Sequence, residues 1–211
     1  MYQVTSEISF FSQIRMILIY FLDYRFLNII LRIMANKLPD IDFRVRVNNE
    51  FETGEACYID NGDPWKTVSS RELFGDKRVV IFSLPGAFTP TCSSQQLPSY
   101  DQKFEEFKSH GIDAIYCISV NDSFVMNAWS HYLGVRNIQM VPDGTGQFTK
   151  SMGMLINKDH LGFGMRSWRY SLIANNMEIE EMFIEEGKND TGSDDDPYKA
   201  TNPDNLLEFL K

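Results

Sequence analysis

The sequence predicts an α/β fold in which helices flank a central mixed sheet. Apolar runs typical of strands alternate along the chain with amphipathic stretches typical of helices, which favours parallel β-α-β units. Two strand-like runs near the C-terminus are separated only by N-N, which is typical of an antiparallel hairpin. With 211 residues, of which 43% are hydrophobic and 23% charged, the chain has the composition of a single globular domain.

The first elements of this fold are short. Residues 43–47, F-R-V-R-V, alternate with period two and predict a strand. Residues 56–60, followed by the turn N-G-D-P, predict either its hairpin partner or an extended loop. The stretch S-S-R-E-L-F places a serine cap before a glutamate, which predicts a short helix that ends before Gly75.

The middle of the chain predicts strands and helices in alternation. Residues 78–84 form a continuous apolar run, as expected of a strand covered on both faces. Residues 93–109 follow as a helix that Pro98 is expected to bend. Residues 112–120 predict the next strand, and Asp122 is expected to cap the helix after it.

The remaining elements complete the sheet. Residues 138–146 predict a strand that ends in a turn, and residues 147–152 a short helix. Residues 166–184 predict the hairpin. The acidic run at 187–197 is expected to be an exposed loop, and residues 204–210 a closing helix.

Residues 1–33 are assigned outside the fold, which leaves residues 34–211 as the folded domain. Phe10–Ile33 is apolar, but charged residues interrupt it before it reaches the length that spans a bilayer. One interpretation is an organelle-targeting leader or interfacial helix. The interpretation that we favour is that the native protein starts at Met34 and that the preceding residues are an extension.

Charge and cysteine content restrict the partners and the compartment. The net charge of −9 disfavours a nucleic acid or an anionic membrane as partner, because either would repel the protein. The three cysteines form no C-x-x-C pair. We therefore expect a reducing compartment, the cytoplasm, with an organelle as the alternative if residues 1–33 are a leader.

Cys92 has the setting of a reactive cysteine. It follows the predicted strand in P-G-A-F-T-P-T-C-S-S, where prolines stiffen a loop and a helix is about to begin. The N-H groups of a helix N-terminus stabilise a thiolate and lower the pKa of a thiol placed there. The alternative is a structural cysteine, which the polar loop disfavours. Cys117, in mid-strand, and Cys57, with no nearby basic residue in sequence, are expected to be structural.

The sequence P-G-A-F-T-P-T-C-S matches the peroxiredoxin signature P-x-x-x-T-x-x-C. With C-I-S-V-N-D-S-F-V-M-N-A-W, D-G-T-G-Q-F-T-K-S-M-G-M and G-F-G-M-R-S-W-R-Y-S, the chain resembles type II peroxiredoxins, the peroxiredoxin-five subfamily, from about Lys37 to Lys211. It is similar to the peroxiredoxin half of bacterial peroxiredoxin-glutaredoxin hybrids. The resemblance implies a thioredoxin-like fold and a thiol-dependent peroxidase that reduces hydrogen peroxide and alkyl hydroperoxides.

The resemblance also implies roles for four residues. Cys92 would be the nucleophile, Thr89 the hydroxyl that binds the peroxide and the sulfur, and Pro85 the residue that shields the site. Arg169 would be the arginine that arrives from a distant strand and stabilises the thiolate. Period two is expected to place it on the face of Ser167 and Ser171, opposite Trp168, Tyr170 and Leu172. Arg166 is expected to lie on the surface or to support the site.

The catalytic cycle is expected to use one cysteine. Some members of the subfamily carry a second cysteine near the C-terminus, but this sequence has none beyond Cys117. An external thiol would then reduce the Cys92 sulfenic acid: glutathione with glutaredoxin first, thioredoxin second. The resemblance implies a homodimer. The chemistry of peroxide reduction by a thiol requires no cofactor. The three histidines have no metal-ligand spacing, so no metal site is expected.

Two other functions remain open from the sequence. A thioredoxin-like disulfide exchanger would need a resolving thiol close after Cys92, where Ser94 and Gln95 stand. A binding or holdase protein of the same fold would not need the nucleophile at all. Loss of peroxidase activity on substitution of Cys92 or Arg169 would distinguish the enzyme from both.

Overall fold

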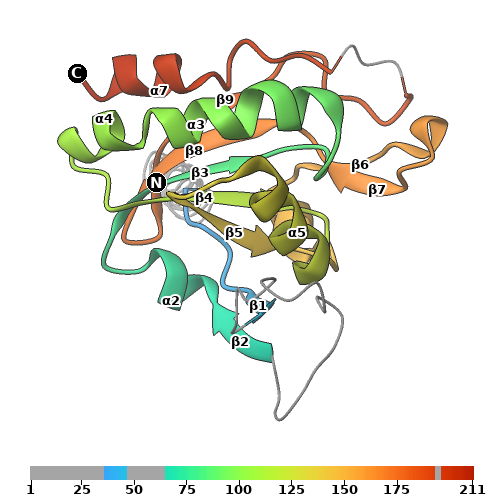
Figure 1. Cartoon of the computed structure of the whole chain (residues 1–211), viewed down its shortest axis with the longest axis horizontal. Coiled ribbons are helices and arrows are strands. Elements are labelled where there is room, and N and C mark those ends of the chain that lie inside the picture. The colour runs from blue at the N-terminus through green and yellow to red at the C-terminus, as the bar shows by residue number, and fades with distance from the viewer. Residues whose placement is uncertain (1–35, 47–64, 193–195) are drawn as a thin grey trace, which may run out of the picture. The chain divides into compact units, whose positions relative to one another are not determined.

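The computed structural model describes residues 36–46, 65–192 and 196–211, and the elements below belong to the unit Leu38–Lys211 (Figure 1). Residues 1–33, the favoured start at Met34 and the predicted element at 56–60 lie outside the described residues, as does Cys57. None of the helices in the described ranges has the length and hydropathy needed to cross a membrane.

A five-stranded mixed sheet forms the centre of the fold, with the strand order β5-β4-β3-β8-β9. In that order the strands are Ile138–Pro142, Ala114–Ser119, Arg78–Ser83, Tyr170–Asn175 and Glu178–Ile184. β3, β4 and β5 are parallel neighbours, whereas β8 runs antiparallel to both β3 and β9. The predicted mixed sheet is confirmed, and the continuous apolar runs became its buried inner strands, β3 and β4.

Helices cover both faces of this sheet (Figure 1). On one face, Phe74 and Phe148 from α2 (Ser70–Phe74) and α6 (Gln147–Ser151) pack with Val79 and Ile81 of β3. On the other face, Val80 and Phe82 of β3 pack with apolar residues of four helices. These helices are α3 (Leu97–Gln102), α4 (Phe104–Ser109), α5 (Ser123–Leu133) and α7 (Pro203–Phe209). Alternate residues of β3 thus supply both halves of the core.

The predicted helix caps are confirmed. The Ser69 hydroxyl accepts from the Glu72 N-H group, and the Glu72 carboxylate accepts from the Ser69 N-H group. The two bonds form a capping box for α2. The Asp122 carboxylate accepts from the Val125 N-H group at the start of α5. Local hydrogen-bonding chemistry therefore defines where these helices begin.

Two short pairs of strands lie beside the main sheet. β1 (Asp42–Arg46) pairs antiparallel with β2 (Trp65–Ser69), a strand that the sequence analysis did not identify. β6 (Leu155–Asn157) pairs antiparallel with β7 (Met165–Ser167), and the short 3-10 helix η2 (Asp159–Leu161) lies between them in the chain.

The predicted helix 93–109 is divided into three pieces. It starts as a π-helical turn, η1 (Cys92–Gln96), in which the Leu97 N-H group bonds to the Cys92 carbonyl. An α-helix would bring the carbonyl of Ser94 against the ring of Pro98, and the wider turn relieves this contact. The bend expected at Pro98 therefore appears as a π-helical turn before it. A second break, at Lys103, separates α3 from α4.

The predicted hairpin is confirmed, but its turn lies one residue later than the predicted N-N pair and its start is corrected. β8 and β9 are joined through Asn176 and Met177, whose φ angles of 47° and 70° suit a tight two-residue turn. However, the predicted first strand is not continuous, because Ser167 ends β7 and Tyr170 begins β8. Arg169 lies in the gap between the two strands.

Candidate active site

Cys92 lies at the end of the loop that follows β3, as the first residue of η1. Its side chain is fully buried and packs in the same apolar cluster as Phe82 and Tyr100. The Ser93 N-H group bonds to the Thr89 carbonyl at 3.0 Å, so the loop leads into the helix without a break in hydrogen bonding. The predicted position of Cys92 at the start of a helix is confirmed.

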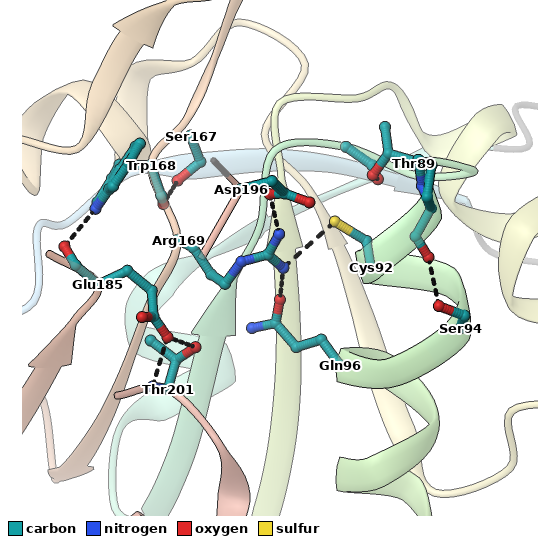
Figure 2. Close-up of polar contacts among 12 residues, drawn as sticks. Thr89, Cys92, Ser94, Gln96, Ser167, Trp168, Arg169, Glu185, Asp196 and Thr201 are labelled. Carbon is teal, nitrogen blue, oxygen red and sulfur yellow. Dashed lines mark hydrogen bonds and ion pairs between the residues drawn. The ribbon is translucent and has the colours of Figure 1, made fainter. Parts of the chain in front are cut away.

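Arg169 lies next to Cys92 because β3, which precedes Cys92 in the chain, and β8, which follows Arg169, are neighbouring strands. Ser83, the last residue of β3, pairs with Tyr170, the first residue of β8. The chain after β3 and the chain before β8 therefore leave the sheet at the same end. Figure 2 shows the Arg169 guanidinium directed at the sulfur, with Nη1 3.5 Å from Sγ. Arg169 is only 1% exposed.

The guanidinium of Arg169 is held by further polar partners (Figure 2). Nη1 also donates to Oε1 of Gln96, and Nη2 forms an ion pair with Asp196. The ring of Tyr198 lies 5.8 Å from the guanidinium carbon, within range of a cation-π contact. Burial acts to lower the pKa of Arg169, but the Cys92 sulfur and the Asp196 carboxylate outweigh it and raise that pKa above its ordinary value. Arg169 is therefore a fixed positive charge beside the sulfur.

Thr89 and Pro85 lie on the loop before Cys92. The Thr89 hydroxyl donates to the Gly86 carbonyl at 2.7 Å, and Thr89 is half-buried, whereas Pro85 is buried. The Ala87 N-H group bonds to the side chain of Asn121, which ties the loop to the end of β4. Thr89 thus lies three residues before Cys92, and its hydroxyl is bound to a carbonyl of the same loop.

Arg166 supports the same loop from β7. Its Nη1 donates to the Val120 carbonyl at 3.2 Å and its Nε to the Phe163 carbonyl. A Cβ atom at Gly86 would lie 3.0 Å from Nη1 of Arg166, so glycine permits this close approach. Burial lowers the pKa of Arg166. Of the two expectations for this residue, a supporting contact fits its position better than an isolated surface arginine.

The expected alternation of side chains around Arg169 holds for Ser171 but not for Ser167. Ser171 accepts a hydrogen bond from the buried Tyr100 hydroxyl, on the sheet face that carries Cys92. Ser167 instead bonds to Ser83, whose hydroxyl donates to it at 2.8 Å. The expectation that Ser167 shares the surround of Arg169 is wrong, because the alternation stops where β7 ends.

Sequence reasoning missed Gln96 and Asp196. Gln96 stands four residues after Cys92, so helical spacing could have indicated it. Asp196 falls in the acidic run that was expected to be an exposed loop, yet its carboxylate binds an arginine that is almost fully buried. Asp196 is half-buried, so the expectation of an exposed loop is corrected at this residue, and no local pattern in the sequence marks its pairing with an arginine.

Cys117 differs from Cys92 in its surroundings. It lies in the middle of β4, fully buried, in the apolar cluster that also contains Cys92. Burial, with a smaller contribution from Cys92, raises the pKa of the Cys117 thiol well above its ordinary value. Its predicted burial is confirmed. Both cysteines are free thiols.

Comparison with known proteins agrees with this geometry. The Redoxin family pattern matches residues 35–200. Peroxiredoxin y4vD of Sinorhizobium fredii is 50% identical over 178 residues, which is 84% of this chain and 92% of that protein. The hybrid peroxiredoxin hyPrx5 of Haemophilus influenzae is 47% identical over 176 residues, which is 83% of this chain and 65% of that protein.

A solved structure supports the same assignment. The Plasmodium falciparum antioxidant protein, described as a 1-Cys peroxiredoxin, aligns with a TM-score of 0.73 and 34% identity over 83% of this chain and 98% of its own. The resemblance and the thioredoxin-like fold expected from the sequence are both confirmed. The chain belongs to the Redoxin family and, within it, is a peroxiredoxin, a thiol-dependent peroxidase.

Proposed function

We propose that this peroxiredoxin reduces hydrogen peroxide and alkyl hydroperoxides with Cys92 as the attacking thiolate. The observation that carries the proposal is the 3.5 Å contact between the Cys92 sulfur and Nη1 of Arg169, inside a buried site. A guanidinium fixed at that distance stabilises a thiolate and remains in place for charge that develops during the reaction.

In the proposed reaction the sulfur of Cys92 attacks one oxygen of the peroxide. The O-O bond breaks, the second oxygen leaves as an alcohol or as water after taking up a proton, and Cys92 becomes a sulfenic acid. Arg169 stabilises the thiolate and the leaving oxygen. Thr89 exchanges its bond to the Gly86 carbonyl for one to the substrate, and the buried Pro85 limits access to the sulfur.

We assign a one-cysteine cycle to the chain. Cys117 is unsuited to resolve the sulfenic acid, because its fully buried thiol has a pKa well above the ordinary value and is retained in the neutral form. An external thiol would instead form a mixed disulfide with Cys92 and release water, and a second thiol would release the reduced enzyme. Glutathione with glutaredoxin is the first candidate and thioredoxin the second.

The test combines turnover with mass spectrometry. Peroxide consumption is measured with each reductant for the parent chain, Cys92→Ser, Arg169→Ala and Cys117→Ser. We expect peroxide consumption to be lost in Cys92→Ser and Arg169→Ala and retained in Cys117→Ser. Equal rates in the parent, Cys92→Ser and Arg169→Ala would refute the assigned site. A stoichiometric disulfide from Cys92 to Cys117 or Cys57 in peroxide-treated, thiol-free protein would refute the one-cysteine cycle.

We further propose that residues 34–211 act as a homodimer in a reducing compartment, the cytoplasm. An exposed aromatic pair supports the dimer: Phe88 and Tyr132 are 51% and 76% exposed and their ring centroids lie 5.8 Å apart. Phe88 stands one residue before Thr89, so a second copy bound there would adjoin the active-site loop. Light scattering of the parent and of Tyr132→Glu tests this, because a dimer that uses the pair should dissociate in the variant.

A further inference from the structure

One guanidinium in this site contacts both a cysteine sulfur and a carboxylate. Arg169 presents Nη1 to the sulfur of Cys92 and Nη2 to the carboxylate of Asp196. Arg169 is 1% exposed, whereas the Asp196 side chain is 38% exposed. The carboxylate therefore approaches the buried charge from the solvent side, and the sulfur approaches it from inside the protein.

The segment that carries Asp196 is anchored by contacts other than its ion pair with Arg169. The hydroxyls of Tyr198 and Ser99 share a hydrogen bond of 2.7 Å. The buried carboxylate of Glu185 accepts from the N-H groups of Lys199 and Thr201, at 2.8 and 2.9 Å. The backbone of Asp196 itself has a φ of 46°, a region that aspartate and asparagine adopt more readily than most residues. These contacts hold the carboxylate at the guanidinium.

The other ionisable groups near this pair come from several elements. β4 contributes the neutral Cys117, and α3 contributes Tyr100, whose hydroxyl is bound to Ser171 and Thr201. The C-terminal segment contributes Tyr198, and the residue after β9 contributes Glu185, already engaged by backbone N-H groups. Burial raises the pKa of both tyrosines, which keeps them neutral near pH 7. Among the residues that the structure describes, Asp196 is thus the carboxylate that forms an ion pair with Arg169.

We propose that Asp196 is a positioning residue for the peroxidase reaction, which holds Nη2 of Arg169 and moderates the positive charge that this guanidinium presents to the Cys92 sulfur. The inference rests on the proposed roles of Cys92 and Arg169. An ion pair at Nη2 fixes the plane of the guanidinium, so that Nη1 points at the sulfur. The same carboxylate offsets part of the field that stabilises the thiolate.

Moderation of this kind has a chemical use. A thiolate that is stabilised too strongly is a weaker nucleophile, because nucleophilicity falls as the thiol becomes more acidic. A carboxylate on the far side of the guanidinium lets the site keep a fixed hydrogen-bond donor without the full effect of an isolated buried cation. Asp196 would therefore set the balance between the fraction of thiolate and its reactivity.

The experiment measures how alkylation of Cys92 by iodoacetamide depends on pH, with the Cys92 peptide read by mass spectrometry in the full chain. Asp196→Asn keeps the shape, the backbone preference and an acceptor oxygen but removes the charge. Asp196→Ser repeats the test if the first variant is unstable in urea unfolding. Glu186→Gln is the control, because it removes the same charge from an exposed position of the same loop. Arg169→Ala and the double variant Asp196→Asn/Arg169→Ala complete the cycle.

We expect the pH of half-maximal alkylation to fall by about 0.5–1 unit in Asp196→Asn, to stay unchanged in Glu186→Gln and to rise in Arg169→Ala. In the double variant Asp196→Asn acts only through the direct repulsion between its carboxylate and the thiolate, so the difference between its effects in the two backgrounds measures the part that acts through Arg169. An unchanged or higher midpoint in Asp196→Asn, with the rise in Arg169→Ala intact, would overturn this inference and leave the proposed site standing. An unchanged midpoint in Arg169→Ala would instead overturn the proposed role of Arg169.

Discussion

Ser83 and Tyr170 face each other across β3 and β8, and this register sets the distance between Cys92 and Arg169. A shift of two residues would move Arg169 by about 6.6 Å along the strand direction, beyond hydrogen-bonding reach of the sulfur. The pairing continues from Ser83 to Arg78, so the whole length of a central strand fixes the site. The geometry of the candidate site thus depends on a buried central strand of the sheet.

Substitution of Arg169 should separate charge from geometry. Arg169→Ala should lower kcat/KM for peroxide about 100- to 1,000-fold, as for loss of one preorganised donor to a developing charge. Arg169→Lys should recover less than about tenfold of this, because one ammonium cannot bond Cys92, Gln96 and Asp196 with the fixed fork of a guanidinium. The measurement is peroxide consumption at several peroxide concentrations. Arg136→Ala, at an exposed arginine, should match the parent, and full activity in Arg169→Lys would contradict the geometric argument.

The hydroxyl of Thr89 should contribute to peroxidase activity, whereas its methyl group should not. Thr89→Val should reduce kcat/KM about 10- to 100-fold, the loss expected for one hydrogen bond to a charged group, whereas Thr89→Ser should retain most activity. Thr91→Val makes the same chemical change two residues away and serves as the control, because Thr91 makes no side-chain bond to the start of η1. Similar losses in the variants at positions 89 and 91 would point to disruption of the loop rather than to a role in binding peroxide.

Gln96 should stabilise the fold as well as the site. Its Oε1 accepts from the buried Arg169, while Nε2 of Gln96 and Nε of Arg169 are buried without a hydrogen-bond partner in the described part of the chain. Gln96→Met removes an acceptor from a buried cation and should lower the free energy of unfolding by about 1–3 kcal/mol. Urea unfolding measures this change. Gln95→Met, at the exposed neighbouring position, should change that free energy by less than about 0.5 kcal/mol. A fully stable Gln96→Met protein would argue that Asp196 alone suffices to hold Arg169.

Alkaline pH should destabilise the protein through Tyr116. Burial raises the pKa of Tyr116 from 10.0 to about 12, and its hydroxyl donates to the Leu73 carbonyl at 2.7 Å. Because the folded state keeps this proton longer than the unfolded state, the stabilisation is fully present below pH 10 and is lost as the pH rises towards 12. Tyr116→Phe should therefore flatten the decline of the unfolding free energy across this window.

The same measurement has a matched control. Tyr132→Phe changes a tyrosine that is 76% exposed in the single chain, and in protein diluted until it is monomeric it should leave the slope as it is in the parent. Tyr116→Phe should also lower the unfolding free energy at neutral pH by about 1 kcal/mol through loss of the hydrogen bond to Leu73. An unchanged slope in Tyr116→Phe would mean that other groups cause the alkaline loss of stability.

The sequence predicted the elements whose signals are local. Ser69 and Asp122 bear hydrogen-bonding side chains that define helix starts, and the apolar run of β3 has one interpretation in an α/β chain. Cys92 was found because its loop has a distinctive composition, and the motif resemblance then assigned Thr89, Pro85 and Arg169. The contact between Arg169 and Cys92 agrees with that assignment, although their catalytic roles stay predictions.

What the sequence could not predict depends on tertiary contacts. The π-helical turn of η1 results from the fit between Pro98 and the preceding carbonyls, which a helical pattern does not encode. Asp196 belongs to an acidic run in which no local pattern marks it as the partner of a buried arginine. The break between Ser167 and Tyr170 is likewise set by the pairing of β7 with β6, not by the alternation of side chains.

The separation of Cys92 and Arg169 by 77 residues also has a consequence for biosynthesis. While the ribosome is still making the second half of the chain, the sulfur has no guanidinium beside it. Only when β8 inserts next to β3 does Cys92 acquire Arg169 as its neighbour. On the roles proposed for these two residues, reactivity towards peroxide would arise together with the native sheet.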